Sequence, residues 1–430
     1  MRCTHLSVSP TQRPAISVML LIMILAISAS ASGPSEKTIY NFHGGNDGSD
    51  ATGNLVADSA GNLYGTTESG GGSTACGFSG SQPQGCGTVF ELSPPAAGGG
   101  TWTETVLYRF QGGSDGSNPN AGLTIDSSGN LYGIATGNST LCDCDVIFKL
   151  SPQSGAWVQS VLYTTDYPTD YEPIGSLTLD SAGNLYGFTS AAVNCGGIFQ
   201  LSPPVSGGTS WTETEIFQFP STRNDPDLCA PIGSLVLDKS GNLYGATQGV
   251  VGGFGTGAVF KLKPPATSGQ PWSLSVLHEF TGGDDGFQPE AGVIFHDGMN
   301  LYGTTYWGGT NNAGTVFELS PPAAGETGWV KTTIFDFDAY TTGQSPVGLV
   351  FDKAGNLYGT TRVGMSGLGG EIFELSPPSA PGGAWIETTL YTTNCDCSAS
   401  GLVFDKGNSL YGLLPWGGTA SEGAAFAITP

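Results

Sequence analysis

Basic residues are scarce in this sequence. Its 430 residues include 13 Lys and Arg against 36 Asp and Glu, which gives a formal net charge of −23 at pH 7. No segment gathers Lys and Arg into a basic patch. Because an acidic surface without such a patch repels phosphate groups, the sequence argues against nucleic acids and anionic membranes as partners.

The usual signatures of catalysis are also missing. The sequence has four histidines and contains no G-x-S-x-G, H-E-x-x-H or phosphate-binding loop. His43, four residues before Asp47, is the one acid–base pair that could be tested as catalytic, although a solvated loop histidine is the simpler interpretation. The sequence therefore favours a non-enzymatic protein without excluding an enzyme.

Long apolar runs are absent apart from residues 15–27. This run is shorter than the ~20 residues that span a bilayer. Arginines precede it and a small-residue A-S-A motif follows at 29–31, which predicts a secretory signal peptide over residues 1–31. We therefore expect residues 32–430 to be secreted or periplasmic, with no membrane span.

Glycine is abundant, with 68 residues, and charged residues make up only 11% of the chain. Such a composition is typical of many short strands joined by turns. The tripeptide Leu-Tyr-Gly recurs every 53 to 68 residues, which indicates one supersecondary unit copied along the chain. Its seven copies begin at Leu63, Leu131, Leu185, Leu243, Leu301, Leu357 and Leu410.

The first unit predicts four antiparallel strands, at residues 53–58, 63–67, 87–92 and 102–110. Gly, Asn and Pro separate them, as in a meander of short strands. The seventh unit stops after its third strand, whereas residues 38–42 at the other end match the end of a fourth strand. An N-terminal strand that completes the last sheet would close a ring and remove its exposed edges.

We therefore predict an all-β fold, a seven-bladed β-propeller of four-stranded antiparallel blades, forming one monomeric domain over 32–430. The expected blades cover residues 53–110, 121–163, 175–219, 233–280, 292–337, 348–391, and 401–428 together with 38–42.

An aspartate ends the first strand of six units. In isolation such a ring of carboxylates looks catalytic, but Asp-x-x-Gly-Asn is turn chemistry in which Asp accepts backbone N–H bonds. We expect the Tyr of each repeat and the fourth-strand Trp to pack between blades, and the Gly after Tyr to let neighbouring sheets approach. The aspartates are Asp58, Asp126, Asp180, Asp238, Asp352 and Asp405, with His296 in unit five.

Binding residues are expected on the rim that carries the variable loops between strands two and three and the links between blades. Tyr306, Trp307 and Trp416 fall in these loops outside the repeated pattern. They could stack on sugar rings, or they could cap the core beneath the loop.

Three blade links share F-x-G-G-x-D-G and carry Asp47, Asp115 and Asp285. These oxygens are weak candidate ligands for Ca²⁺. The spacing does not match an EF-hand, and D-G is also a common turn dipeptide. No other cofactor is indicated.

Eight cysteines follow the predicted signal peptide, which indicates disulfides in an oxidising compartment. Cys76 and Cys86 bracket one loop and form the first expected pair, and Cys195 with Cys229 is the second. Zinc is the alternative for these thiols, but no C-x-x-C motif or nearby His supports it. The remaining four could pair locally or with each other: Cys142, Cys144, Cys395 and Cys397.

The motifs L-x-x-D-x-x-G-N-L-Y-G-T-T, G-T-V-F-E-L-S-P-P and F-x-G-G-x-D-G-x-x-P-x-A-G-L resemble the bacterial extracellular tandem repeat called GloVer. The resemblance covers residues 38–430, and the first hairpin also resembles NHL-type propeller repeats. It implies an exported bacterial protein, often with a C-terminal surface anchor. No anchor is visible here, which implies release or a periplasmic location. The resemblance brings no catalytic residues.

Together these features predict an exported propeller that acts as a binding or interaction scaffold for an extracellular glycan or protein. A secreted polysaccharide-degrading hydrolase or lyase is one alternative, and a structural cell-surface protein is another.

Overall fold

The computed structural model divides the chain into two compact units, Met1–Gly33 and Pro34–Pro430. The predicted signal peptide lies outside the described residues. The structure describes residues 35–79, 82–96, 99–137, 145–165, 172–190, 195–205, 208–220, 227–249, 255–267, 269–365, 367, 369–380, 382–393 and 398–429.

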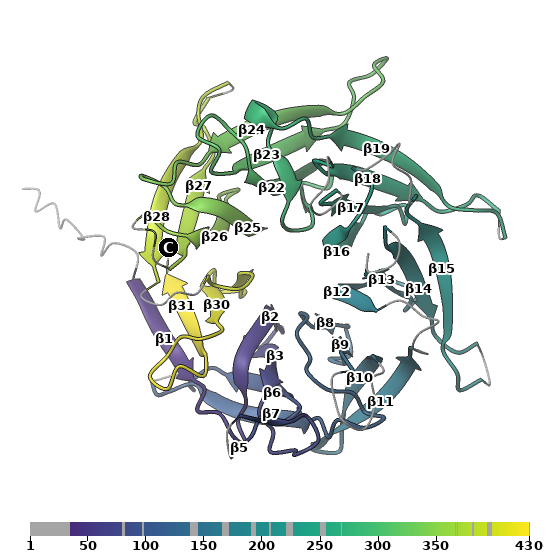
Figure 1. Ribbon diagram of the computed structural model, residues 1–430, viewed down its shortest axis with the longest axis vertical. Helices are drawn as coiled ribbons and strands as arrows, with labels where there is room; N and C mark the ends of the chain where they lie inside the picture. Colours follow the sequence, from purple (N-terminus) through teal and green to yellow (C-terminus); the bar gives the residue numbers. More distant parts are fainter. Residues whose placement is uncertain are drawn as a thin grey trace, which may run out of the picture. The chain divides into compact units, whose positions relative to one another are not determined.

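The second unit is a ring of seven antiparallel sheets, the blades, arranged around a common axis (Figure 1). From the axis outward, blade 1 contains β2 (Ser49–Ala57), β3 (Leu63–Ser69), β6 (Thr88–Ser93) and β7 (Thr103–Arg109). Blade 2 contains β8 (Thr124–Ile125), β9 (Leu131–Ala135), β10 (Val146–Gln153) and β11 (Ala156–Thr164). Blade 3 contains β12 (Pro173–Leu179), β13 (Leu185–Thr189), β14 (Gly197–Ser202) and β15 (Thr212–Gln218).

The later blades repeat this order. Blade 4 contains β16 (Pro231–Leu237), β17 (Leu243–Thr247), β18 (Ala258–Lys263) and β19 (Ser273–Glu279). In blade 5 the innermost strand is split into β20 (Phe287–Pro289) and β21 (Ile294–His296), followed by β22 (Asn300–Trp307), β23 (Thr315–Ser320) and β24 (Val330–Asp336). Blade 6 contains β25 (Gln344–Phe351), β26 (Leu357–Val363), β27 (Glu371–Ser376) and β28 (Ile386–Thr392).

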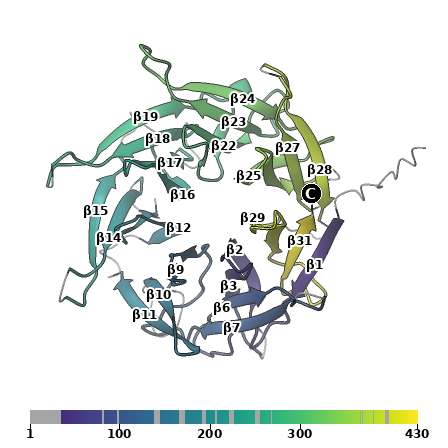
Figure 2. The same ribbon diagram turned by 180° about the vertical axis from the view of Figure 1, so that it is seen from behind.

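Blade 7 joins the two ends of the ring. It contains β29 (Val403–Phe404), β30 (Leu410–Leu414), β31 (Ala424–Thr429) and the N-terminal strand β1 (Ser35–Asn41). β1 pairs antiparallel with β31, with Thr38 opposite Phe426, and Figure 2 shows the two strands side by side. The predicted closure of a seven-bladed propeller is therefore confirmed.

Two minor elements lie outside the blades, a β4–β5 pair (Phe78–Ser79 and Gln82–Pro83) and a short 3₁₀ helix η1 (Gly283–Asp285). No helix among the described residues is long and apolar enough to cross a membrane.

The innermost strand of blade 1 begins four residues earlier than the predicted residue 53. The register with β3 shifts between Thr52 and Val56, so the strand continues through a bulge that the sequence pattern did not show. Gly53, at φ +73°, forms this bulge, and a Cβ there would lie 2.7 Å from the carbonyl carbon of Ala121 in blade 2. Only glycine fits so close to the neighbouring backbone.

Aromatic side chains join neighbouring blades, as expected. Tyr64 of blade 1 lies 6.1 Å from Trp157 of blade 2 between ring centroids, and Trp102 lies 5.4 Å from Tyr411 of blade 7. These contacts place the repeated Tyr and Trp in the hydrophobic layer between sheets.

In most blades the glycine after Tyr has a different role from the one predicted. A Cβ at Gly65 would lie 2.6 Å from the Phe90 ring and 3.0 Å from Leu55, both in the same blade. Gly65 is directly opposite Phe90 in the β3–β6 register. Gly65 therefore makes room for the phenylalanine of its own sheet. At Gly245 the prediction holds in part, because a Cβ there would also lie 2.9 Å from Phe188 of the neighbouring blade 3.

Candidate functional site

The ring has two unlike faces. Links between blades and the loops that follow the second strands lie together on one face, which we call the link face. Backbone hydrogen bonds join these segments, for example from Gly71 N to Gly45 O at 2.7 Å and from Gly309 N to Gly283 O at 2.9 Å. The opposite face carries the short turns after the first strands, and we call it the turn face. The link face is the loop-rich rim expected from the sequence.

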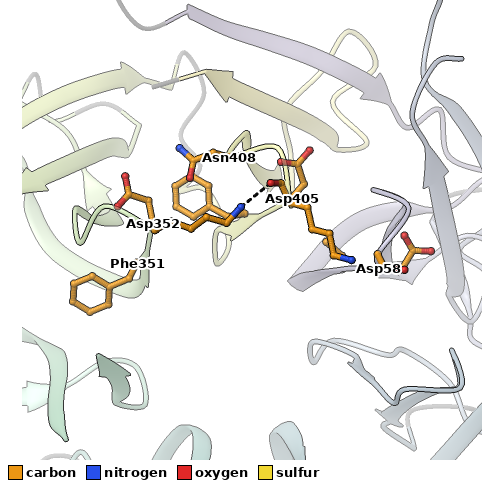
Figure 3. A pocket seen from close by; sticks show the side chains of 10 residues that line it. Asp58, Phe351, Asp352, Asp405 and Asn408 are labelled. Atoms are coloured by element: carbon orange, nitrogen blue, oxygen red, sulfur yellow. Dashed lines mark hydrogen bonds between the residues drawn. The ribbon is translucent and has the colours of Figure 1, made fainter. Parts of the chain in front are cut away.

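A pocket of about 370 Å³ opens on the turn face between blades 6, 7 and 1 (Figure 3). The carboxylates in its wall are held by their own turns. Asp58 accepts hydrogen bonds from the backbone N–H of Ala60 and Asn62, from the Asn62 side chain and from the Tyr64 hydroxyl. Burial disfavours the Asp58 carboxylate, but these hydrogen bonds outweigh it and lower its pKa. The predicted turn role of this aspartate is confirmed.

Two further side chains of this pocket, Asp352 and Lys353, also form hydrogen bonds with the turns. Asp352 accepts from Ala354 N, from Asn356 and from a tyrosine hydroxyl, in the same pattern as Asp58. Lys353 Nζ donates to the backbone oxygen of Lys406 at 2.7 Å, which connects the turns of blades 6 and 7. The pocket thus consists mainly of structural turns.

On the link face, the three Ca²⁺ candidates lie in three separate blade links. Asp115 accepts hydrogen bonds from Tyr108 Oη at 2.9 Å and from the backbone N–H of Gln111 and Gly113. In each of the three links, the aspartate accepts a hydrogen bond from a backbone N–H of the same link. No group of three or more His, Cys, Asp or Glu in the described part of the chain could hold a metal ion. The structure does not bring Asp47, Asp115 and Asp285 together.

The acid–base candidates are adjacent, with His43 Nδ1 3.2 Å from Asp47 Oδ2. Asp47 also accepts from the His43 backbone N–H and from Tyr40 Oη at 2.9 Å. The His43 side chain is 67% exposed. Asp47 thus holds its link by the same kind of hydrogen bonds as Asp115, from a tyrosine hydroxyl and a backbone N–H.

Sequence reasoning missed a carboxyl group beside this pair. Glu104 in β7 has a buried Oε1 without a hydrogen-bond partner among the described residues. Burial, and then the nearby Asp47 carboxylate, raise the pKa of Glu104 to about 7, although Arg109 opposes both effects.

Two other blades place different residues at this position. Gln159 and Lys331 have the same register as Glu104, opposite the last leucine of the third strand. Gln159 Nε2 donates to the Asp115 backbone oxygen at 3.0 Å, and Lys331 Nζ lies 3.2 Å from Asp285 Oδ1. An alignment of the fourth strands shows that the residue at this position differs between blades. Only the structure shows that its side chain faces the link.

The candidate sugar-stacking residues lie in two blades. Tyr306 and Trp307 end β22, with ring centroids 4.8 Å apart in an edge-to-face arrangement, and both are partly buried. Trp416 follows β30 in blade 7 and is 61% exposed.

A polar cluster on the link face connects blades 4, 5 and 6. We call Gln248, Glu290, Tyr306 and Arg362 the blade 4–6 cluster. Arg362 Nη2 forms an ion pair with Glu290 Oε1, and Gln248 Nε2 donates to Glu290 Oε2 at 3.0 Å. The guanidinium carbon lies 5.6 Å from the centre of the Tyr306 ring. Arg362 therefore combines an ion pair with a cation–π contact.

Burial distinguishes the two charges of this cluster. The Glu290 side chain is 11% exposed, whereas that of Arg362 is 49% exposed. Burial raises the pKa of Glu290, although Arg362 and Gln248 oppose the shift by stabilising the carboxylate. Glu290 is thus a fixed partner beneath an accessible guanidinium.

Gln248, Tyr306 and Arg362 of the cluster occupy one repeat position that differs from blade to blade. The Leu-Tyr-Gly core of the second strand is the same in all seven units, but the residue five positions after this leucine differs in every unit. Packing therefore does not dictate this residue. The seven residues are Glu68, Thr136, Ser190, Gln248, Tyr306, Arg362 and Pro415. The sequence alone shows this variation. It does not show that the variable residues of blades 4, 5 and 6 lie close together in space.

Another cavity, of about 260 Å³, lies on the link face between blades 2 and 3. Asn120, Thr136 and Glu172 supply its polar wall. Burial, and then Asp145, raise the pKa of Glu172. Thr136 occupies the same variable position as Tyr306 and Arg362.

Two disulfides secure link-face loops. Cys76–Cys86 closes a loop of blade 1, and Cys195–Cys229 joins a blade 3 loop to the link that leads to blade 4. These are the first and second expected pairs. Cys142, Cys144, Cys395 and Cys397 lie outside the described residues.

Comparison with solved structures finds other propeller proteins at low sequence identity. PorZ, a bacterial surface component of the type-IX secretion system of Porphyromonas gingivalis, matches 90% of this chain with 16% identity and a TM-score of 0.55. The extracellular domain of a putative hybrid two-component system from B. thetaiotaomicron matches 92% with 13% identity and a TM-score of 0.52. The match covers 47% and 41% of those two chains, so this chain spans less than half of their lengths.

A protein from Lactobacillus plantarum matches 83% of this chain and 98% of its own, with 13% identity and a TM-score of 0.53. Such likenesses show the fold alone. No curated protein matches the sequence significantly. The model of the Gloeobacter/Verrucomicrobia repeat matches twice, at residues 28–226 and 208–426, which together cover nearly all of the propeller. The chain therefore belongs to the Gloeobacter/Verrucomicrobia repeat family.

Proposed function

We infer that this protein is an exported binding scaffold that recognises an extracellular glycan or protein through its link face. The observation that carries this inference is the blade 4–6 cluster. Gln248, Glu290, Tyr306 and Arg362 come from three blades and form connected polar and aromatic contacts. Three of them, Gln248, Tyr306 and Arg362, occupy the repeat position that varies from blade to blade. Loops and strand ends on a rigid scaffold are where binding residues collect.

The contacts within the cluster favour binding over catalysis. Glu290 receives hydrogen bonds on both carboxylate oxygens, so it is poorly placed to transfer a proton. Arg362 and Tyr306 present planar surfaces, which suit recognition of a ligand. Two disulfides support a location outside the cytoplasm, where oxidised cysteine pairs persist.

A binding screen tests the proposal. The purified chain is applied to glycan arrays and to extracellular proteins, in parallel with a Tyr306→Ala/Arg362→Ala double variant. Ile386→Ala is the matched control, because Ile386 is 65% exposed on the outermost strand β28. We expect a ligand that binds the natural chain and the Ile386 variant but not the double variant.

The double variant Trp307→Ala/Trp416→Ala tests the sugar-stacking part separately. If a glycan binds equally well to the natural chain and to Trp307→Ala/Trp416→Ala, those indoles make no contact with it. Degradation of polysaccharides by the purified chain would favour the hydrolase or lyase alternative. Absence of both binding and degradation would favour a structural surface protein.

A further inference from the structure

The blade 4–6 cluster orients one arginine through a chain of contacts. Gln248 of blade 4 donates to Glu290 of blade 5 at 3.0 Å, and Glu290 holds Nη2 of Arg362 from blade 6. Tyr306 supports the face of the guanidinium, 5.6 Å from the ring centre. Two direct contacts, from Glu290 and Tyr306, therefore restrict the arginine side chain, and Gln248 holds Glu290 in place.

Part of this guanidinium remains available to a ligand. Arg362 is 49% exposed, and within the described part of the chain the polar contact of its side chain runs from Nη2 to Glu290. A guanidinium has five N–H donors in a planar fork that fits a carboxylate with two parallel hydrogen bonds. An arginine fixed by a buried carboxylate and a tyrosine is thus prepared for a second carboxylate on its open side.

Aromatic rings beside the guanidinium indicate what carries that carboxylate. Trp307 follows Tyr306 directly and its ring lies 4.8 Å from the tyrosine ring. Adjacent aromatic surfaces can stack on the apolar face of a sugar ring, while the arginine binds a charged substituent.

We propose that Arg362 binds the carboxylate of an acidic sugar, a uronate unit of an extracellular polysaccharide, with Tyr306 and Trp307 beside the sugar ring. This inference rests on the proposed binding function. The net charge of −23 does not prevent it, because at physiological ionic strength charges beyond roughly 8 Å are screened and the local guanidinium dominates.

Glu290 acts as a positioning residue and also as a competitor. Its negative charge compensates Arg362 and repels a bound carboxylate. Gln at this position keeps an oxygen that accepts from Arg362 but removes the charge. Glu290→Gln should therefore strengthen binding of an acidic sugar, whereas a purely structural role for Glu290 would make the substitution weaken all binding.

The test uses a panel of galacturonate, glucuronate and mannuronate oligosaccharides, each paired with the same oligosaccharide after reduction of its carboxyl groups. Affinities for this panel and for an oligoglutamate peptide are measured calorimetrically. The proteins are the natural chain, Arg362→Gln, Glu290→Gln, Tyr306→Ala and the Ile386→Ala control. We expect at least one uronate to bind more tightly than its reduced partner. Arg362→Gln should lower that affinity about ten- to hundredfold, the range for a charged hydrogen-bonded pair.

Each other outcome overturns the proposal in a recognisable way. Equal binding of uronates and reduced sugars, lost in Tyr306→Ala, would remove the acidic specificity and leave the binding function standing. Tighter binding of an oligoglutamate peptide than of every uronate would assign the site to acidic peptides instead. No binding to the panel or to the arrays would overturn both inferences.

Discussion

Glu104 provides a sharp test of how blade 1 meets the link from blade 7. Its Oε1 is buried without a partner in the described structure, where Gln159 and Lys331 of other blades donate to their links. Glu104→Gln replaces the carboxyl group by the amide that blade 2 already uses. We expect the substitution to stabilise the protein at neutral and alkaline pH.

The magnitude follows from the pKa of Glu104, which burial, and then Asp47, raise from 4.5 to about 7. This interval corresponds to about 3 kcal/mol at about 1.4 kcal/mol per pH unit. Because Glu104 is only partly buried, water screens the interaction, and we discount the value to about 1–2 kcal/mol.

The effect of Glu104 on the free energy of unfolding depends on pH. The raised pKa means that the folded state disfavours the carboxylate, so the penalty is absent below pH 4.5, grows between pH 4.5 and 7, and is complete above pH 7. Glu104→Gln removes it. The variant should therefore unfold at higher urea concentration than the natural chain at pH 8 and at the same concentration at pH 4.

Urea unfolding followed by tryptophan fluorescence at pH 4, 5.5, 7 and 8 measures this difference. Gln159→Glu is the matched control, because it places a carboxyl group beside Asp115 in the same register and should introduce a similar pH-dependent loss. An equal effect of Glu104→Gln at pH 4 and pH 8, or destabilisation at pH 8, would refute the reasoning.

Three further substitutions test backbone and covalent features. Gly53→Ala should destabilise the protein by more than about 2 kcal/mol in urea unfolding, since its Cβ would meet the Ala121 backbone at 2.7 Å and φ is positive. Ala230→Gly should raise the free energy of unfolding by up to about 1 kcal/mol, and with it the urea midpoint, because Ala230 has φ +56°. Cys195→Ser should cost about 2–4 kcal/mol, measured against the natural chain under non-reducing conditions, because Cys195–Cys229 spans 34 residues.

Controls separate these effects from general sensitivity. Gly129 has φ +80° and open space around its Cβ position, so Gly129→Ala measures the cost of positive φ without the clash. A loss at Gly53 no larger than at Gly129 would contradict the close approach to blade 2. A lower midpoint for Ala230→Gly would show that its left-handed backbone carries no strain. Equal stability of Cys195→Ser and the natural chain would show that this disulfide does not restrict the unfolded state.

The sequence by itself determined the number of blades, the strand order and the closure. Leu-Tyr-Gly repeats seven times, and residues 38–42 supply the strand missing from the last unit. These are local patterns, because strand alternation, turns such as Asp58–Asn62 and cysteine spacing act within one unit or between neighbours. It also predicted that binding residues lie in the variable loops, without showing which of these residues come together.

Contacts between blades were decided only by the tertiary structure. The bulge at Gly53, the approach of Glu104 to Asp47 and the contact of Gln248, Glu290 and Arg362 depend on how the sheets stack around the axis. A sequence pattern describes residue spacing along the chain, and this spacing is nearly the same in every repeat. Which side chains of different blades face each other depends instead on sheet twist, register and the position of the links, and these are fixed when the ring closes.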